Sequence, residues 1–308
     1  MNDRNLLAVV EIGLPDATLE WSDIRESAMD GDEIRTLKSG ILLGECPRWH
    51  GGRLYFADWV SETIHAVSED GDSQTFARIA SLPLSFDWLP DGRMLIVNAR
   101  QKKLQLFGGE GLADFLDLGK FEHGCNEIVV DATGRIYVNN VNYRFPGGDF
   151  RPGFIALITP DGKVLRQEHD LAFPNGMVIT PDGKTLVCAE SMGGTLAAFD
   201  IAADGSLVNR RVWAKIGEWG GDGITMDAEG AIWTSVGPRC IRVREGGDVL
   251  EEFTLDRMAF ALMLGGADGK TLFVCANEWT GSVDVTKATG LLLARRVSVP
   301  HAGFPRAG

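Results

Sequence analysis

Cysteine is scarce in this sequence: the chain of 308 residues has five, and no two of them form a C-x-x-C pair. An odd number of cysteines without such a pair argues against a disulfide framework and against a thiolate zinc site. We therefore expect free thiols, as in a protein of the reducing cytoplasm.

Basic residues are also in deficit. Lys and Arg together number 30 against 43 for Asp and Glu, so the formal net charge is −13. A surface of that sign repels the phosphates of nucleic acids and the headgroups of anionic lipids. The sequence therefore predicts that nucleic acid is not a partner.

Long apolar runs are missing as well. The run at residues 6–10 is short, is followed by Glu11, and lacks the basic flank and small-residue cleavage site of a signal peptide. No later run approaches the length of a membrane span. We therefore expect neither a leader nor a membrane partner.

Helical periodicity is almost absent, whereas glycine is abundant, with 38 residues. Short apolar runs, such as residues 93–98, 185–189 and 271–275, are bounded by Gly, Asp or Asn. This pattern predicts many short β-strands joined by tight turns.

A tight turn followed by an apolar strand recurs six times. The turns end in glycine, at Gly52, Gly92, Gly134, Gly183, Gly230 and Gly269. The separations are 40, 42, 49, 47 and 39 residues, which is the length of a four-stranded propeller blade. The sequence therefore predicts an all-β fold, a six-bladed β-propeller with four-stranded blades around a central channel.

We expect residues 1–308 to form one propeller domain, with residues 1–33 as an extension before the repeat. The apolar residues 6–12 of this extension are either an added outer strand or a loosely held segment. A propeller closes its ring when a strand from one end of the chain completes the last blade, which removes exposed edges. Residues 34–37 and 291–299 are the candidates for this closure.

One position in each blade, at equivalent register on the innermost strand, is expected to face the channel. Counting back seven or eight residues from each turn glycine gives Glu45, Ser85, Asn126, Asn175, Asp222 and Ala261. Two carboxylates and two amides that converge in a partly dehydrated channel are costly unless a cation satisfies them. Their oxygens are ligands that Ca²⁺, Mg²⁺ and Mn²⁺ prefer. Asn-Gly and Asp-Gly are also ordinary turn dipeptides, but their shared offset from the turns favours a metal site.

Four motifs surround these residues: LGECPRW at 43–49, NEIVVD at 126–131, FPNGM at 173–177 and DGITMD at 222–227. From about residue 40 to the C-terminus the chain resembles the gluconolactonase, regucalcin and senescence-marker-protein family. The resemblance implies one divalent metal ion in the channel, held by Glu45, Asn126, Asn175 and Asp222, with Asn126 alternatively a partner of substrate or water. We expect Ca²⁺ first, with Zn²⁺, Mn²⁺, Mg²⁺ or Fe²⁺ as alternatives.

The resemblance further implies a metal-dependent lactonase that acts on a small-molecule lactone. We expect Asp222 to be the general base, and Ser85, His123 and Asn142 to contact the substrate. Two alternatives stay open: a hydrolase of phosphorus esters or fluorides on the same site, since the architecture also resembles calcium-dependent diisopropylfluorophosphatases, and a non-catalytic calcium-binding propeller.

One position departs from the sugar-lactonase pattern. Members that act on sugar acids often carry an Arg two residues before the third-blade Asn, where this chain has Gly124. A guanidinium there would bind substrate oxygens in bidentate fashion. We therefore expect simple or aromatic lactones to be opened about as well as sugar lactones, unless Asn142, Arg144 or Arg151 of the long loop at residues 142–153 replaces the missing Arg.

Overall fold

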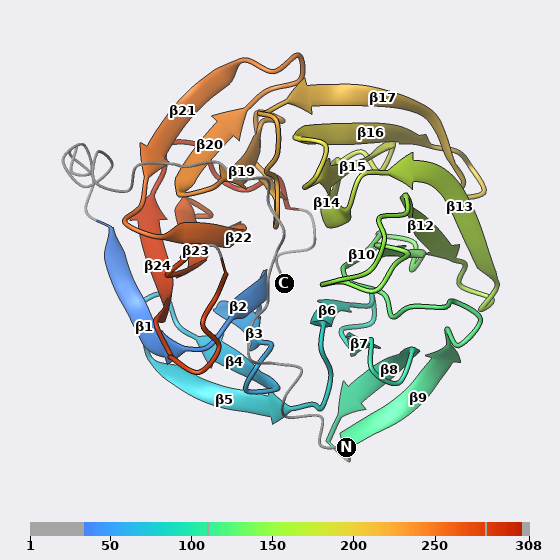
Figure 1. Cartoon of the computed structure of the whole chain (residues 1–308), viewed down its shortest axis with the longest axis horizontal. Coiled ribbons are helices and arrows are strands. Elements are labelled where there is room, and N and C mark those ends of the chain that lie inside the picture. The colour runs from blue at the N-terminus through green and yellow to red at the C-terminus, as the bar shows by residue number, and fades with distance from the viewer. Residues whose placement is uncertain (1–33, 110, 281, 304–308) are drawn as a thin grey trace.

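The computed structural model describes residues 34–109, 111–280 and 282–303. The predicted extension, residues 1–33, lies outside the described residues. Within the described ranges the chain forms six sheets of four strands, and it contains no helix long and apolar enough to cross a membrane. Figure 1 shows the sheets arranged radially around a central axis, which confirms the predicted six-bladed propeller.

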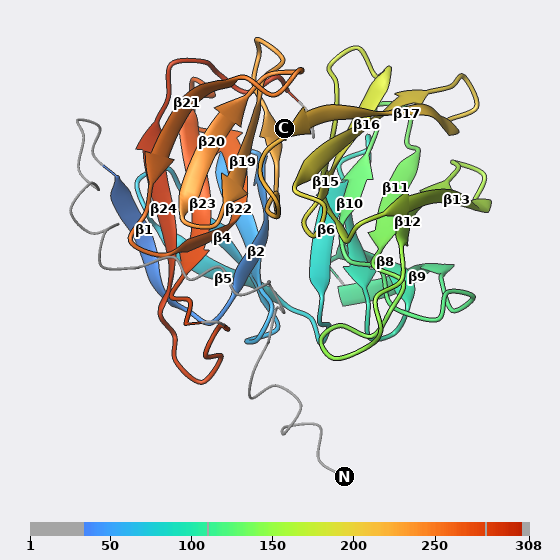
Figure 2. The same ribbon diagram turned by 45° about the horizontal axis from the view of Figure 1, so that its top comes forward.

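In each blade neighbouring strands are antiparallel, as in a meander. Blades one to three consist of β2 (Gly44–His50), β3 (Arg53–Asp58), β4 (Thr63–Val67) and β5 (Ser73–Arg78); β6 (Leu84–Trp88), β7 (Met94–Asn98), β8 (Lys103–Gly108) and β9 (Gly111–Asp117); and β10 (Ile128–Val130), β11 (Ile136–Asn140), β12 (Gly153–Ile158) and β13 (Val164–Leu171). Figure 2 shows blades two, three and four on one side of the axis and the blades built from the beginning and the end of the described chain on the other.

Blades four to six complete the ring. They consist of β14 (Pro174–Ile179), β15 (Thr185–Glu190), β16 (Thr195–Ile201) and β17 (Leu207–Lys215); β18 (Thr225–Met226), β19 (Ile232–Val236), β20 (Arg239–Val243) and β21 (Val249–Thr254); and β22 (Met258–Gly265), β23 (Thr271–Asn277), β24 (Gly290–Arg296) and β1 (Arg35–Ile41). The sixth blade therefore takes its outermost strand from the beginning of the described chain, as predicted.

The six repeated turns join the first and second strands of the six blades. The final glycine of each turn has a positive φ, between +70° at Gly183 and +86° at Gly92. Glycine adopts this left-handed conformation without the steric cost that a side chain would add. The glycine therefore recurs in the sequence because every blade contains the same turn, and this turn needs a residue with a positive φ at its last position.

The core lies between the blades. Six clusters of buried hydrophobic residues each combine the facing sides of two neighbouring blades, so that every blade is packed on both sides. The five cysteines are free and buried, in agreement with the expectation of free thiols.

Closure of the ring rests on β1. Its register with β24 runs from Arg35 opposite Ala294 to Ile41 opposite Gly290. The strand continues beyond the predicted residues 34–37 because Ile41 is fully buried in the cluster shared by the first and sixth blades. Through the buried Ile41 side chain, the closing strand packs against residues of both the first and the sixth blade.

We predict that Ile41→Ala lowers the free energy of unfolding by about 2–5 kcal/mol, because it removes buried methyl groups and leaves a cavity at the closing blade. Ser39→Ala changes an exposed residue of the same strand and should stay within about 0.5 kcal/mol of the parent. Chemical denaturation measures both variants, and equal effects would show that the contact of Ile41 does not stabilise the closure.

Candidate active site

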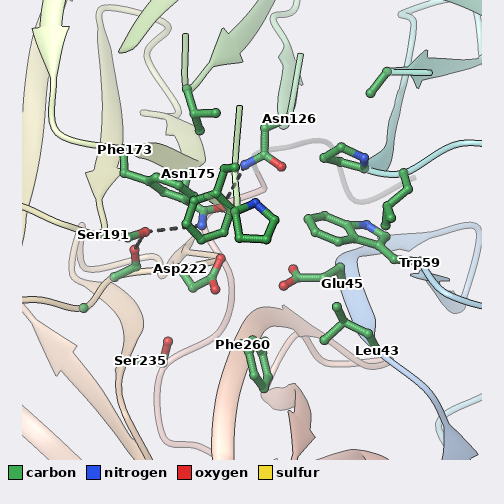
Figure 3. A pocket seen from close by; sticks show the side chains of 18 of the residues that line it. Leu43, Glu45, Trp59, Asn126, Phe173, Asn175, Ser191, Asp222, Ser235 and Phe260 are labelled. Carbon is green, nitrogen blue, oxygen red and sulfur yellow. Dashed lines mark hydrogen bonds between the residues drawn. The ribbon is translucent and has the colours of Figure 1, made fainter. Parts of the chain in front are cut away.

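A cavity of about 380 Å³ occupies one end of the central channel. Its lining comes from the beginnings of inner strands and from the loops at the same end, whereas the six glycine turns lie at the other end of those strands. Four of the six residues predicted to face the channel line it: Glu45, Asn126, Asn175 and Asp222. Figure 3 shows the carboxylates of Glu45 and Asp222 directed toward one another, with the two amides beside them. We call these four residues the floor.

Irregular backbone places the floor residues. In β2, Glu45 and Arg48 face Ala57 and Tyr55 of β3, so one extra residue lies in β2 and forms a bulge. The same one-residue shift occurs in β14, between Pro174 and Met177. Bulges redirect side chains, and they are frequent beside active sites.

The other two floor residues come directly before short inner strands. Asn126 precedes β10, which begins at Ile128, and Asp222 precedes β18, which begins at Thr225. Their backbone is nevertheless hydrogen-bonded: Asn126 N donates to the Asn139 carbonyl of the same blade at 2.9 Å, and the Asp222 carbonyl accepts from Gly176 N of the neighbouring blade at 3.1 Å. These bonds fix the backbone of both residues where the inner strands begin.

The remaining two channel positions do not line the cavity. Strand β6 pairs with β7 without a bulge, and the fully buried Ser85 donates its hydroxyl to the Asn126 carbonyl at 2.6 Å. Ala261 is buried against the backbone of Gly223 in the neighbouring blade. The structure therefore places Ser85 under a floor residue and outside the lining of the cavity.

Of the other predicted substrate contacts, His123 lines the cavity and Asn142 does not. The His123 side chain is 24% exposed and lies 3.6 Å from a carboxylate oxygen of Glu122. Asn142 has a positive φ of 65°, and its amide donates to the carbonyl of Pro152 at 2.9 Å. The Asn142 amide therefore forms a hydrogen bond within the long loop of blade three. The residues that follow Asn142 in this loop line the cavity instead.

Polar residues beneath the floor were not found by sequence reasoning. The buried Arg48 donates to Glu127 at 2.8 Å and to the Ile128 carbonyl at 2.9 Å. Asn139 donates to the Asn175 carbonyl at 2.5 Å and accepts from the backbone of Glu127 at 3.1 Å. A polar residue within the apolar strand β11 was the one available signal, for Asn139; Arg48 and Glu127 are 79 positions apart, and no local pattern connects them.

Burial makes the two floor carboxylates expensive to ionise. The pKa of Glu45 is raised well above its usual range by burial, by Asp222 and by Glu127. The pKa of Asp222 is raised to about 8 by burial and by Glu127, against a lowering hydrogen bond from Asn175. Without a positive charge between them, these carboxyls tend to keep their protons.

A hard divalent cation fits this donor set. The floor offers two carboxylates and two amides, and oxygen donors of this kind suit Ca²⁺ or Mg²⁺. Within the described residues, His, Cys, Asp and Glu form no group of three or more that could hold a metal ion. A cation on the floor would therefore need both acidic residues together with the neutral amide oxygens.

The fold and the site define a class: a six-bladed propeller with an acidic, oxygen-rich centre in its channel. Residues 43–278 match the family model described as "SMP-30/Gluconolactonase/LRE-like region". Since the match covers most of the chain, this protein belongs to that family, and the resemblance inferred from the sequence is confirmed.

Individual relatives are distant. The pentonolactonase XacC of Haloferax volcanii is 23% identical over 248 residues, which are 78% of this chain and 83% of the relative. A luciferin-regenerating enzyme superposes with a TM-score of 0.75 at 18% identity, over 88% of this chain and 97% of its own. The calcium-binding protein regucalcin of Agrobacterium tumefaciens gives 0.73 at 20% identity, over 88% and 95%. Both structural likenesses are likenesses of fold.

We predict that protein stripped of divalent cations becomes less stable as the pH rises from about 4 to about 8. Over this range the folded protein retains protons on Asp222 and Glu45 that the unfolded chain releases, so the free energy of unfolding falls. Asp222→Asn should weaken this dependence and should be more stable than the parent near pH 8. Chemical denaturation in excess chelator measures both.

The matched control is Asp149→Asn, which changes an exposed carboxylate of the blade-three loop. It should leave the pH profile of stability unchanged. A stripped parent protein that gains stability across this pH range would contradict the raised pKa values.

Proposed function

We propose that this protein is a metal-dependent hydrolase that opens the ring of a small-molecule lactone. The observation that carries the proposal is the pair of carboxylates, Glu45 and Asp222, which face one another on the floor of a cavity large enough for a small molecule. The family description names gluconolactonase, and one relative is named a pentonolactonase, which supports a lactone as the substrate class.

Ca²⁺ is our first candidate for the metal ion. The floor has oxygen donors only, and the solved regucalcin with the same fold is described as a calcium-binding protein. What a divalent cation supplies when bound there is positive charge, which polarises the lactone carbonyl and stabilises the oxyanion that forms on attack by water.

The protein's own residues carry the proton transfer. Asp222, ionised, accepts a proton from the attacking water and returns it to the ring oxygen as the bond between that oxygen and the carbonyl carbon breaks. The product is an open-chain hydroxy acid. Asn175, which hydrogen-bonds to Asp222, orients this carboxylate, while Glu45 contributes the second negative charge of the floor.

The backbone bonds beneath the floor support this geometry. Ser85 and Asn139 hold the carbonyls of Asn126 and Asn175, and Arg48 offsets the charge of the buried Glu127. Residues that fix the orientation of ligands typically change activity about 10–100-fold when they are replaced.

A non-catalytic calcium site would not need the open cavity above the floor.

We predict that Asp222→Asn and Glu45→Gln each lower kcat/KM for lactone opening by more than about 100-fold, because each removes a charge that holds the cation. Excess chelator should abolish turnover, and Ca²⁺ or another divalent metal ion should restore it. A lactone panel assayed in a pH indicator measures these rates. Asp149→Asn, with its exposed carboxylate, is the control and should match the parent.

Full activity in excess chelator, with no metal detected in the purified protein, would exclude the proposed mechanism. Unchanged activity of Asp222→Asn in metal-loaded protein would exclude Asp222 as the base.

A further inference from the structure

The walls above the floor are dominated by aromatic rings: Trp59, Tyr143, Phe145, Phe173, Trp219 and Phe260. Three of them pack edge to face on the side of blade three, with 4.8 Å between the ring centroids of Phe145 and Phe173 and 6.0 Å between those of Tyr143 and Phe145. Such contacts hold rings in a fixed arrangement, which offers a preformed apolar surface to a ligand.

Two of these aromatic residues, Trp59 and Tyr143, have their polar atoms hydrogen-bonded to the protein. The indole nitrogen of Trp59 donates to the Leu84 carbonyl at 2.8 Å, and the hydroxyl of Tyr143 donates to the sulfur of Met192 at 3.4 Å. Both residues therefore present carbon to the cavity. The same is true of Leu43, Pro83 and Met258 elsewhere in the wall.

A further part of the cavity wall, at Gly124, has no side chain. This glycine lines the cavity two residues before Asn126, and a Cβ at this position would lie 2.5 Å from the Ala99 carbonyl oxygen and 2.8 Å from the Ala99 Cβ. No side chain fits there unless the backbone of one of these loops moves. The absence of a polar side chain at Gly124 is therefore a packing requirement of blades two and three.

Few polar side chains remain above the floor to bind hydroxyl groups: those that line the cavity are His123, Arg144, Ser191 and Ser235. Ser191 already donates to the Gly221 carbonyl and lies 3.3 Å from the Asn175 amide, which donates to it. Of the loop residues that were candidates to replace a missing Arg, Asn142 and Arg151 are bonded to Pro152 and Glu122, and Arg144 alone lines the cavity. Arg144 is exposed to solvent.

From these contacts we infer that the substrate is a lactone whose ring bears an aryl or alkyl substituent, and that the substituent lies against the aromatic wall with Phe145 as its specificity-determining contact. This inference rests on the proposed lactone hydrolysis and specifies its substrate class. A polyhydroxylated sugar lactone would bury several hydroxyls against carbon, and each one left unbonded lowers binding about fivefold or more.

The test compares γ-butyrolactone with derivatives that bear methyl, propyl, pentyl or phenyl groups, and with glucono-δ-lactone, on the metal-loaded protein. Each methylene buried against the wall should raise kcat/KM by about fourfold until the cavity is full. The kcat/KM for the phenyl derivative should exceed the kcat/KM for glucono-δ-lactone by at least about tenfold. Matching lactams, which resist hydrolysis, should show the same order of affinities by calorimetry.

Phe145→Ala should lower the ratio of kcat/KM for the phenyl derivative to kcat/KM for γ-butyrolactone by about tenfold. Phe145→Leu should lower this ratio less, because Leu keeps part of the apolar contact. Phe115→Ala is the matched control: this ring lies on β9, the outermost strand of blade two, is 39% exposed and does not line the cavity. It should keep the parent ratio. Equal unfolding midpoints would show that the loop variants are folded.

The possible outcomes distinguish a failure of the apolar substrate from a failure of the proposed lactone hydrolysis. A tenfold preference for glucono-δ-lactone that Arg144→Ala removes would overturn the apolar substrate and leave lactone hydrolysis standing. Lactam affinities that rise with the substituent, with no lactone opened under any metal, would contradict the proposed function and retain the apolar ligand. Equal rates and affinities across the panel would overturn the role of the aromatic wall.

Discussion

The pairing of β1 with β24 is the interaction on which the rest of this molecule depends. A blade is stable because each of its faces packs against a neighbour, and six shared clusters provide these contacts only if the ring is closed. An open ring would expose the apolar face of a terminal blade and the edge of β24. Closure also brings the inner strands of blades one, three, four and five to one axis, so the convergence of Glu45 with Asp222 is a consequence of it.

The floor is where this fold accepts a local cost. Two carboxyls are buried there, and burial together with a neighbouring carboxylate raises the pKa of each, Asp222 acting on Glu45 and Glu127 on Asp222. The backbone at Cys46 and Phe173 takes positive φ angles that residues with side chains avoid. Strain and desolvation of this kind concentrate at functional sites, where the surrounding structure holds them in place. Here the surrounding support is the set of hydrogen bonds from Ser85 and Asn139 to the backbone of the floor residues.

Much of the architecture could be predicted from the sequence, because one turn is repeated with glycine at a position that demands a positive φ. The same count found the four floor residues. It also gave Ser85 and Ala261, which do not line the cavity; β6 has no bulge and keeps Ser85 beneath the floor. Asn142 was expected from the long loop and not from this count, and its amide hydrogen-bonds within that loop. A count along the chain carries no information about bulges, which insert a residue into one strand only.

The sequence by itself determined the number of blades, the place of the turns, the acidic character of the channel and the family to which the chain belongs. Only the tertiary structure decided which channel residues meet, which polar groups support them and that the walls are aromatic. The physical reason is distance along the chain. A turn is specified by a few adjacent residues, whereas the Arg48 and Glu127 pair, the contact of Gly124 with Ala99 and the opposed carboxylates join segments that come together only when the ring has closed.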